Sequence, residues 1–403
     1  MSIDSCPAGR TFDQRRRTPD LYSRRVTAPA ERLLISCGEP SGDLYAAELL
    51  KHLRALRPKL SVFGLGGDRL ASEGAELLAN VRELAVVGLQ EVVSHLLKFR
   101  RIFRELLAAV DRNPPSGAVL VDYPDFNLRL ARALARRGIP VVYYVSPQLW
   151  AWRRGRVHTV RETVRRMLVI FPFEETIYRD AGVPVTFVGH PLVDLVRPAP
   201  DRAAFLSSLQ FDPSRPVVAL LPGSRPSEIR HNLPALAGSV SQLSRQRPDL
   251  QFVAAIAPTL PPRSVSGPLA GLPVRCVAGQ ANAIVGAADL AIVASGTATV
   301  EAALLGTPMV VVYRVAPLTY LLGRPLVHVP HYAMVNLIAG ERAVPELIQR
   351  EFTADRVTLE TLGLLGNPEA SSRMREALAE VRKRLGQPGA SARAALEVAQ
   401  ILR

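Results

Sequence analysis

Short apolar runs alternate with longer amphipathic runs along most of this chain. From residue 33 onward, apolar stretches of about five residues have the character of buried strands, and the stretches between them have helical periodicity. This alternation is typical of βαβ units around a parallel sheet. The pattern predicts strands at 33–37, 61–65, 118–122, 140–145, 167–171 and 185–188, and a second series at 216–221, 251–256, 273–277, 289–294 and 308–313.

A Pro-rich stretch, residues 189–200, separates the two series and is predicted to be a linker. A chain of 403 residues is long enough for two domains with a core each. Two βαβ series of similar size predict two doubly wound, Rossmann-like α/β domains that face each other across a cleft. We expect a mobile basic tail at 1–30, an N-terminal domain at 31–190, a C-terminal domain at 191–365, and helices at 366–403 that pack either on the N-terminal domain or on the partner subunit of a homodimer.

Composition and charge narrow the class of protein. The net charge of +14 favours an anionic partner. Nucleic acid is not expected as that partner, because the sequence has no RNA-binding motif with interleaved aromatic residues and no zinc-finger spacing. Three scattered cysteines predict neither a disulfide framework nor a metal cluster. No apolar run approaches the ~18–20 residues that span a bilayer, and the N-terminus lacks the apolar stretch of a secretory signal. We therefore expect a cytoplasmic protein.

Candidate catalytic residues follow two strands of the first series, where ligands bind in open α/β sheets. Gly38 to Gly42 are expected to form a turn before a helix, and Glu39 within it would repel a phosphate. The turn is therefore either a floor for a sugar hydroxyl or a plain βα turn. Asp122 and Asp125 follow the apolar strand Ala118–Val121, and either carboxylate can take a proton from a hydroxyl. We favour Asp122 as the base and Asp125 as a helix cap, while Asp125 and Glu39 stay candidates.

Two turns of the second series predict a nucleotide diphosphate site. The first turn, residues 220–225, ends in Gly223, Ser224 and Arg225. Gly223 permits another group to approach the backbone closely, and Ser224 can cap the following helix. Arg225 supplies a forked hydrogen-bond donor for phosphate oxygens. Residues 294–301 open a helix whose N-terminus can hold a diphosphate. The sequence has no Gly-x-Gly-x-x-Gly, Walker A or Asp-x-Asp motif. We therefore expect no cofactor and no metal, with the leaving diphosphate stabilised by arginine and backbone N–H groups.

Six motifs follow one another along the chain: Gly38–Asp43, Asp122–Asn127, Tyr144–Arg153, Phe171–Glu174, Leu221–Arg225 with Glu228, and Ser295–Glu301. Taken together and in this order, they resemble the motifs of the lipid-A-disaccharide synthase family, and the resemblance runs from about residue 33 to the C-terminus. The motif Tyr144–Arg153, which contains both tryptophans of the chain, is the most specific of them, although a packed loop is an alternative interpretation of that stretch.

The resemblance implies the GT-B architecture and an inverting, metal-independent reaction. A UDP-2,3-diacylglucosamine donor would transfer its sugar to the 6-hydroxyl of 2,3-diacylglucosamine 1-phosphate (lipid X), giving a β-1,6-linked disaccharide phosphate and UDP. The implied UDP-binding residues are Ser224, Arg225, Glu228, Ser295, Gly296, Thr297, Ala298, Glu301 and Asn336, and the implied cleft residues are Gly38, Ser41, Ser146, Trp150 and Arg153. The family usually has Pro where Val335 precedes Asn336, so the geometry of that loop stays open.

Three other functions remain as alternatives at this stage. The first is a related GT-B transferase that uses a different UDP-sugar and a soluble acceptor. The second is a UDP-sugar epimerase of the same architecture, and the third is a nucleotide-binding protein without catalysis. Analysis of the product would separate them, because they yield a disaccharide, an epimerised sugar or nothing.

Residues 86–104 combine a wide apolar arc with a basic cluster at one end. Apolar residues at helical spacing usually mean core, but a basic amphipathic segment also binds an anionic bilayer surface. Substrates with acyl chains, which the resemblance implies, would give such a surface a purpose. We therefore expect a peripheral protein on the cytoplasmic face of the inner membrane. The candidate membrane or acyl-chain residues are Leu89, Val92, Val93, Leu96, Leu97 and Phe99.

Overall fold

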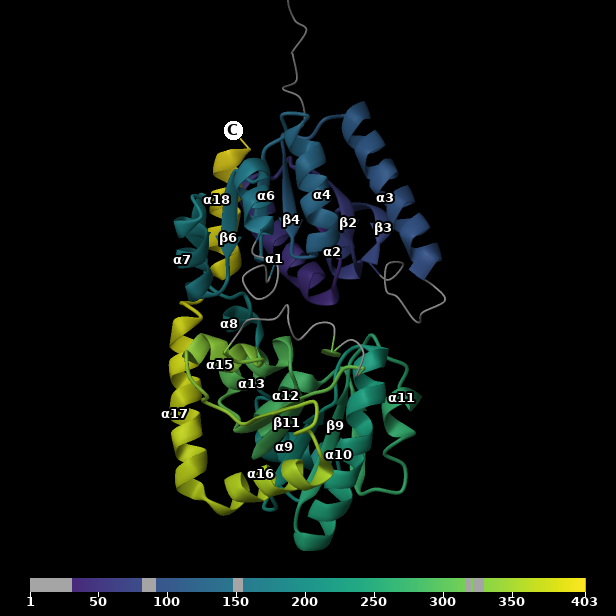
Figure 1. The fold of residues 1–403 in the computed structure, drawn as a ribbon, viewed down its shortest axis with the longest axis vertical. Coiled ribbons are helices and arrows are strands. Elements are labelled where there is room, and N and C mark those ends of the chain that lie inside the picture. Colours follow the sequence, from purple (N-terminus) through teal and green to yellow (C-terminus); the bar gives the residue numbers. More distant parts are fainter. Residues whose placement is uncertain (1–30, 82–91, 148–154, 317–319, 322–329, 403) are drawn as a thin grey trace, which may run out of the picture. The chain divides into compact units, whose positions relative to one another are not determined.

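The computed structural model describes residues 31–81, 92–147, 155–316, 320–321 and 330–402, and of residues 92–96 only the helix backbone. Figure 1 shows the strands and helices of these residues. All the paired strands are parallel, and they form one sheet of seven strands and one of six. The prediction of two Rossmann-like α/β halves is confirmed.

The first sheet has the strand order β3-β2-β1-β4-β5-β6-β7, so the chain winds outward in both directions from the central pair β1 and β4. Strand β4 is buried at every position, which is expected of a parallel strand covered on both faces. The strands are β1 (Arg32–Cys37), β2 (Ser61–Gly66), β3 (Glu76–Asn80), β4 (Gly117–Val121), β5 (Val141–Tyr144), β6 (Arg166–Val169) and β7 (Val185–Phe187).

Helices cover both faces of this sheet. Along β1, Leu33 and Ile35 belong to one apolar cluster and Leu34 to another, because successive side chains of a strand point to opposite faces. The first cluster includes residues of α1, and the second includes residues of α3 and α4. The helices are α1 (Pro40–Leu56), α2 (Asp68–Ser72), α3 (Val92–Arg112), α4 (Pro124–Ala135), α6 (Arg156–Thr163) and α7 (Pro172–Asp180).

The second sheet repeats the plan, with the order β10-β9-β8-β11-β12-β13 and β8 and β11 as its central pair. Its strands are β8 (Val217–Leu221), β9 (Gln251–Ile256), β10 (Val274–Ala278), β11 (Leu290–Ala294), β12 (Met309–Tyr313) and β13 (Glu346–Ile348). Helices α10 and α16 pack on this sheet and on each other, and α12 and α13 also contact it. The helices are α9 (Arg202–Ser208), α10 (Pro226–Gln246), α11 (Arg263–Ser266), α12 (Ala281–Ala287), α13 (Thr297–Leu305), α15 (Met334–Ala339) and α16 (Ala354–Gly366).

Every strand expected from the apolar pattern is present within one or two residues of its expected bounds. The pattern missed β3 and β13. The expected start of the first helix was wrong, because α1 begins at Pro40 and not at Asp43. Proline fits the first helical turn, where its missing N–H is not needed. Residues 258–273, which connect β9 to β10, contain the single turn of α11.

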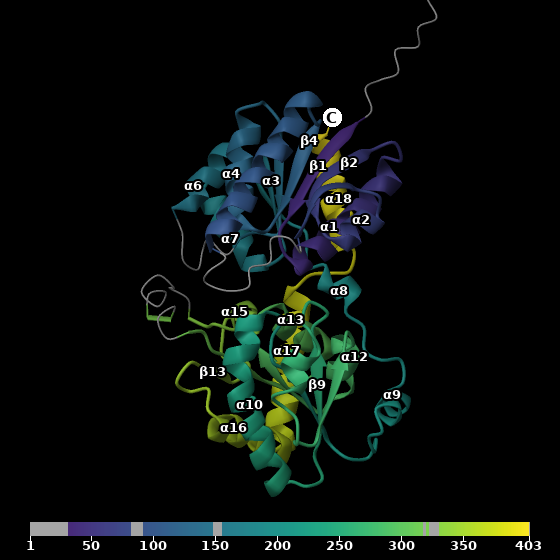
Figure 2. The same ribbon diagram turned by 90° about the vertical axis from the view of Figure 1, so that its right-hand side faces the viewer.

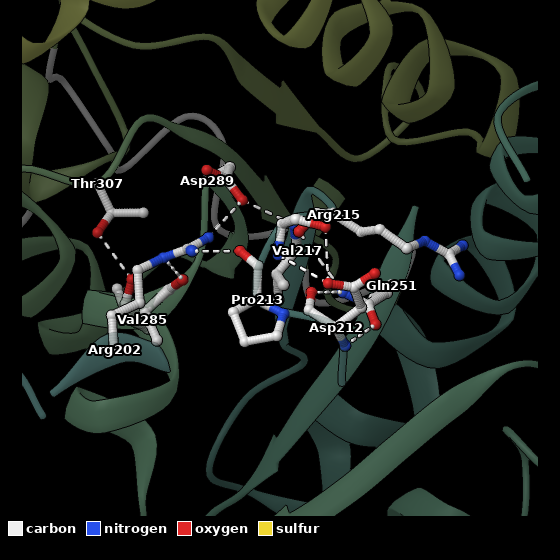
Figure 3. A network of polar contacts seen from close by, with 11 residues as sticks. Arg202, Asp212, Pro213, Arg215, Val217, Gln251, Val285, Asp289 and Thr307 are labelled. Atoms are coloured by element: carbon white, nitrogen blue, oxygen red, sulfur yellow. Dashed lines mark hydrogen bonds and ion pairs between the residues drawn. The ribbon is translucent and has the colours of Figure 1, made fainter. Parts of the chain in front are cut away.

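A polar network closes the amino-terminal edge of the second sheet (Figure 3). The guanidinium of Arg202 donates to the carbonyl oxygens of Ala287 and Pro213 and to the carboxylate of Asp289. That carboxylate also accepts from the backbone N–H of Val217, the first residue of β8. The network therefore ties α9 to the starts of the two central strands, at the edge opposite the strand ends where ligands bind in such folds.

The C-terminal helices are α17 (Pro368–Arg384) and α18 (Ala390–Ile401). Helix α17 packs on α13 and α15 of the second half, whereas α18 packs on α1 and β5 of the first (Figure 2). The guanidinium of Arg57 donates to the carbonyl oxygen of Ala399, and that of Arg393 donates to Val188. The stretch expected as a linker contains α8 (Leu192–Leu195), with Leu192 and Val193 buried. The chain therefore crosses between the halves twice, and both crossings are packed.

Candidate active site

Four turns that follow the central strands carry the candidate site residues. Gly38 and Glu39 follow β1, and Asp122 follows β4, which are the two neighbouring strands from which the first sheet winds in opposite directions. The turns after β8 and β11 hold the same positions in the second sheet. Ligands of open α/β sheets bind at such switch points, outside the carboxyl ends of the strands.

The turn between β1 and α1 is tightly packed. A Cβ on Gly38 would overlap the ring of Tyr123, so only glycine fits there. Glu39 is the N-cap residue of α1, and its side chain makes no capping hydrogen bond. The buried carboxylate of Asp43 accepts from the backbone N–H groups of Gly67, Arg69 and Leu70 and so fastens the start of α2. Sequence reasoning missed this role, since a single acidic residue in a helix gives no sign of a distant backbone partner.

The turn between β4 and α4 is backbone-strained. Asp122 has φ +47° and Tyr123 has φ +50°, two successive non-glycine residues in the left-handed region. This region costs about 1–2 kcal/mol per residue, less for Asp than for Tyr. The buried amide of Asn127 donates to the carbonyl oxygens of Ser36, Val121 and Asp122, and its oxygen accepts from the Ser36 hydroxyl. Asn127 thereby fastens the ends of the central strands and holds the strained turn.

Asp122 has the electrostatics of a general base. Asp122 is half-buried as a residue, and surrounding protein atoms remove most of the hydration of its carboxylate. Desolvation raises the pKa of Asp122 to about 7, with a further contribution from the negative charge of Glu39. The Tyr123 N–H and the Arg225 cation act in the opposite direction. A base whose pKa lies near neutrality accepts and releases a proton readily at physiological pH.

The other two candidate carboxylates have cationic partners. Asp125 is exposed and lies 2.7 Å from the guanidinium of Arg156. It occupies the first turn of α4, where the helix dipole favours an acid, but the N-cap residue is Tyr123 and not Asp125. Glu39 lies 2.8 Å from the guanidinium of Arg225. The expectation that Asp125 caps the helix is therefore wrong, because the cap residue lies two positions earlier.

The turn between β8 and α10 is built around Glu228. Its carboxylate accepts from the backbone N–H groups of Ser224 and Arg225 and lies 3.3 Å from the Arg225 guanidinium. Gly223 has φ +132°, and a Cβ there would collide with the Glu228 side chain. The close approach predicted for Gly223 is thus to Glu228. Arg225, not Ser224, is the N-cap residue, and its guanidinium reaches Glu39 of the first half.

The turn between β11 and α13 exposes a helix N-terminus. Gly296, the N-cap residue, and Thr297, the first helical residue, are exposed, and Ala298 is half-buried. The Ser295 hydroxyl donates to the carbonyl oxygen of Tyr332. Glu301, one turn into α13, is half-buried, and burial raises its pKa. The backbone at this turn and Arg225 lie after the two central strands of the second sheet.

The remaining predicted site residues fall into three groups. Ser41 is half-buried in the first turn of α1. The polar atoms of Asn336 and Ser146 are engaged within the protein: Asn336 bonds Val344 and Glu346, and the Ser146 hydroxyl lies 2.8 Å from that of Tyr178. Trp150, Arg153 and Leu89 lie outside the described residues.

The candidate membrane segment is in part helix α3. Leu97 is 61% exposed, and the basic residues Lys98, Arg100, Arg101 and Arg104 are exposed around it. Phe99, in contrast, packs edge-on against Phe126 of α4, with ring centroids 4.8 Å apart. Val92, Val93 and Leu96 lie in the helix, and their side chains are outside the description. Phe99 therefore contributes to packing within the first half.

The fold alone defines the broad class of the chain. It is similar to the calicheamicin glycosyltransferase CalG4, with a TM-score of 0.58 and 17% identity over 93% of this chain and 98% of that one. It is also similar to a UDP-GlcNAc 2-epimerase from Neisseria meningitidis, with a TM-score of 0.62 and 12% identity over 92% and 99%. The two parallel sheets and these likenesses place the chain in the GT-B class of two-domain, Rossmann-like proteins.

Sequence comparison shows to which family of that class the chain belongs. A family model described as "Lipid-A-disaccharide synthetase" matches residues 33–401. A lipid-A-disaccharide synthase of Myxococcus xanthus is 47% identical over 92% of this chain and 97% of that protein. The chain therefore belongs to the lipid-A-disaccharide synthetase family and is a glycosyltransferase of lipid A biosynthesis. The resemblance given by the motifs is confirmed, and the epimerase alternative is set aside.

The buried charge of Asp122 should cost stability in a pH-dependent manner. Its pKa rises from 3.8 in the unfolded chain to about 7 in the fold, so stability falls as pH rises through this window. Asp122→Asn should therefore raise the thermal unfolding midpoint more at pH 8.5 than at pH 5. Asp125→Asn, which removes an exposed carboxylate of the same turn, is the matched control. An equal change at both pH values in Asp122→Asn would contradict the raised pKa.

Proposed function

We propose that the chain joins UDP-2,3-diacylglucosamine to 2,3-diacylglucosamine 1-phosphate with Asp122 as the general base and Arg225 on the departing diphosphate. The products are a β-1,6-linked disaccharide phosphate and UDP. The observation that carries this proposal is that the Arg225 guanidinium lies close enough to the Asp122 carboxylate to change its pKa. The Arg225 cation, from the second half, acts on the pKa of Asp122 in the first. Glu39 acts on the same carboxylate and is paired with Arg225.

The proposed chemical step is a single in-line displacement. The Asp122 carboxylate takes the proton of the acceptor 6-hydroxyl as that oxygen attacks the anomeric carbon of the donor. The bond from this carbon to the diphosphate oxygen breaks, and its electron pair leaves with UDP. The anomeric configuration is inverted because the nucleophile and the leaving group occupy opposite sides. A general base contributes typically about 10²–10⁴-fold to such a rate.

The surroundings of the three carboxylates favour Asp122 as the base. Asp125 and Glu39 are each engaged by an arginine guanidinium, at 2.7 Å and 2.8 Å respectively. Asp122 is desolvated, and its pKa near 7 suits a base at neutral pH. Its position after β4 also agrees with the rule that ligands bind at the switch point.

The donor diphosphate is proposed to lie between the turns that follow β8 and β11. Arg225 offers a forked donor that already binds two carboxylates, and phosphate oxygens have similar hydrogen-bonding geometry. The exposed N-terminus of α13 offers backbone N–H groups and the positive end of a helix dipole. Glu301 stays the proposed acceptor for ribose hydroxyls. The proposed UDP-contacting residues are Ser224, Arg225, Glu228, Ser295, Gly296, Thr297, Ala298, Glu301 and Asn336.

The protein is proposed to dock on the cytoplasmic face of the inner membrane through α3. An exposed leucine among four exposed basic side chains suits an anionic bilayer, which attracts each cation by about 1 kcal/mol near the surface. No helix of the described residues is long and apolar enough to cross a membrane.

The base assignment predicts a sharp difference between two matched variants. Asp122→Asn should lower turnover about 10²–10⁴-fold, since an amide cannot take the proton, and should keep UDP affinity. Asp125→Asn should retain most activity. With the unaltered chain, kcat/KM should rise with pH through about 7, because the carboxylate must be charged. The measurement is formation of radiolabelled disaccharide phosphate. Near-normal turnover of Asp122→Asn would move the role to another group.

The donor assignment predicts weaker UDP binding in Arg225→Ala. A charge-assisted hydrogen bond contributes about 1.5–3 kcal/mol, so the dissociation constant measured by calorimetry should rise at least tenfold. Arg215→Ala is the control, because Arg215 bonds backbone carbonyls at the opposite edge of the same sheet. Equal UDP affinity of Arg225→Ala and the unaltered chain would exclude Arg225 from the diphosphate site.

The docking proposal predicts that Leu97→Ser reduces binding to vesicles that contain anionic phospholipid, while the circular dichroism spectrum is retained. Leu359→Ser is the matched control, since Leu359 is 63% exposed but lies on α16 of the second half. Salt should release the unaltered protein only partly, because apolar contact persists when charges are screened. Identical vesicle binding of the two variants would oppose docking through α3.

A further inference from the structure

The peptide group between Asp122 and Tyr123 is held at its carbonyl oxygen. This oxygen accepts from the Tyr143 hydroxyl at 2.6 Å and from the Asn127 amide at 2.8 Å. The N–H of the same peptide group belongs to Tyr123, and it lowers the pKa of the Asp122 carboxylate. Because a peptide group is planar, its carbonyl and N–H point in opposite directions and turn together. Holding the carbonyl therefore also fixes the direction of the N–H.

Tyr143 is unusual for a residue in the middle of a buried sheet. It lies on β5, its ring is fully buried, and its hydroxyl reaches past the end of β4 to the strained turn. Burial raises the pKa of Tyr143 well above its usual value, so the hydroxyl keeps its proton and acts as a donor. A buried tyrosine needs some partner for its hydroxyl. For Tyr143 this partner is the backbone carbonyl oxygen of Asp122, the proposed base. Asp122 is the first of two successive residues with left-handed backbone angles.

We propose that the Tyr143 hydroxyl is a positioning group for the reaction, which acts by holding the backbone carbonyl of Asp122 so that the carboxylate keeps the orientation of a base. The proposal rests on the proposed function, in which Asp122 takes the proton. Tyr143 itself contacts neither substrate nor reacting atoms. Asn127 supplies the second hydrogen bond to the same oxygen and also ties it to Ser36.

Removal of the hydroxyl would leave one restraint on this carbonyl where there were two. The peptide can then turn, and the strained residues can relax toward ordinary backbone angles. The carboxylate would lose both its orientation and the N–H that stabilises its charged form. The charged groups that act on it, Glu39 and Arg225, are unaltered by this change. Donor binding should also be unaltered, because the proposed diphosphate contacts lie in the second half.

The test is Tyr143→Phe, which keeps the ring and removes one oxygen. We expect kcat to fall about 10–100-fold, as for a catalytic group displaced by about 1 Å. The donor KM and the UDP dissociation constant should stay within twofold of those of the unaltered chain. The acidic limb of the kcat/KM profile should move to higher pH. Tyr144→Phe is the matched control, since Tyr144 is the next, equally buried residue of β5 and its hydroxyl lies near Ser391 of α18.

A double variant separates positioning from a general effect on the fold. If Tyr143 acts through the Asp122 carboxylate, Tyr143→Phe should cost no further turnover in the Asp122→Asn background. A purely structural role would instead give a lower unfolding midpoint with normal kcat and an unmoved pH profile, and this result would overturn the inference. Full activity of Asp122→Asn would overturn the proposed function itself. An inactive Asp122→Asn with a normal Tyr143→Phe would reject the positioning role alone.

Discussion

Both halves of the chain depend on the same constraint of parallel sheets. Parallel strands need crossover connections, so the turns at their carboxyl ends are not closed by hairpins. Where winding reverses, at β1 and β4 and again at β8 and β11, the chain departs from neighbouring strands toward different helices. The turns at these four strand ends carry Glu39, Asp122, Arg225 and Ser295. The proposed chemistry is thus assigned to positions that the strand order itself creates.

The positions of the strands could largely be predicted, because the sequence signal of a strand is local. A parallel strand buried on both faces is an apolar run, such as Ala118–Val121, and all the predicted runs became strands. The two missed strands lie at sheet edges, β3 being partly exposed and β13 only three residues long. The start of α1 was misplaced because Pro40, Ser41 and Gly42 are turn formers in sequence, yet the first turn of a helix accepts them.

The candidate site could be predicted only as far as residue type and position allow. Carboxylates and an arginine after strands were visible in the sequence, but their environments were not. Desolvation distinguishes Asp122 from Asp125, and it arises from atoms that are distant in the chain. The role of Tyr143 could not be predicted for a different reason, because a tyrosine within an apolar strand is expected to be an ordinary core residue. The role of its hydroxyl can be inferred only from the structure, in which the hydroxyl donates to the left-handed turn at Asp122.

For Glu39, the sequence and the structure lead to different conclusions about a phosphate site. An acid in the turn after β1 argued against a phosphate there, and the structure instead gives it an arginine of the second half. Both side chains of this pair are partly exposed, at 39% and 57%, and such pairs contribute only about 0–1 kcal/mol. A diphosphate carries more negative charge than one carboxylate and can displace it from Arg225 at little cost. In the proposed mechanism, Glu39 therefore neutralises the arginine without blocking it and lies beside the base, whose pKa its charge helps to raise.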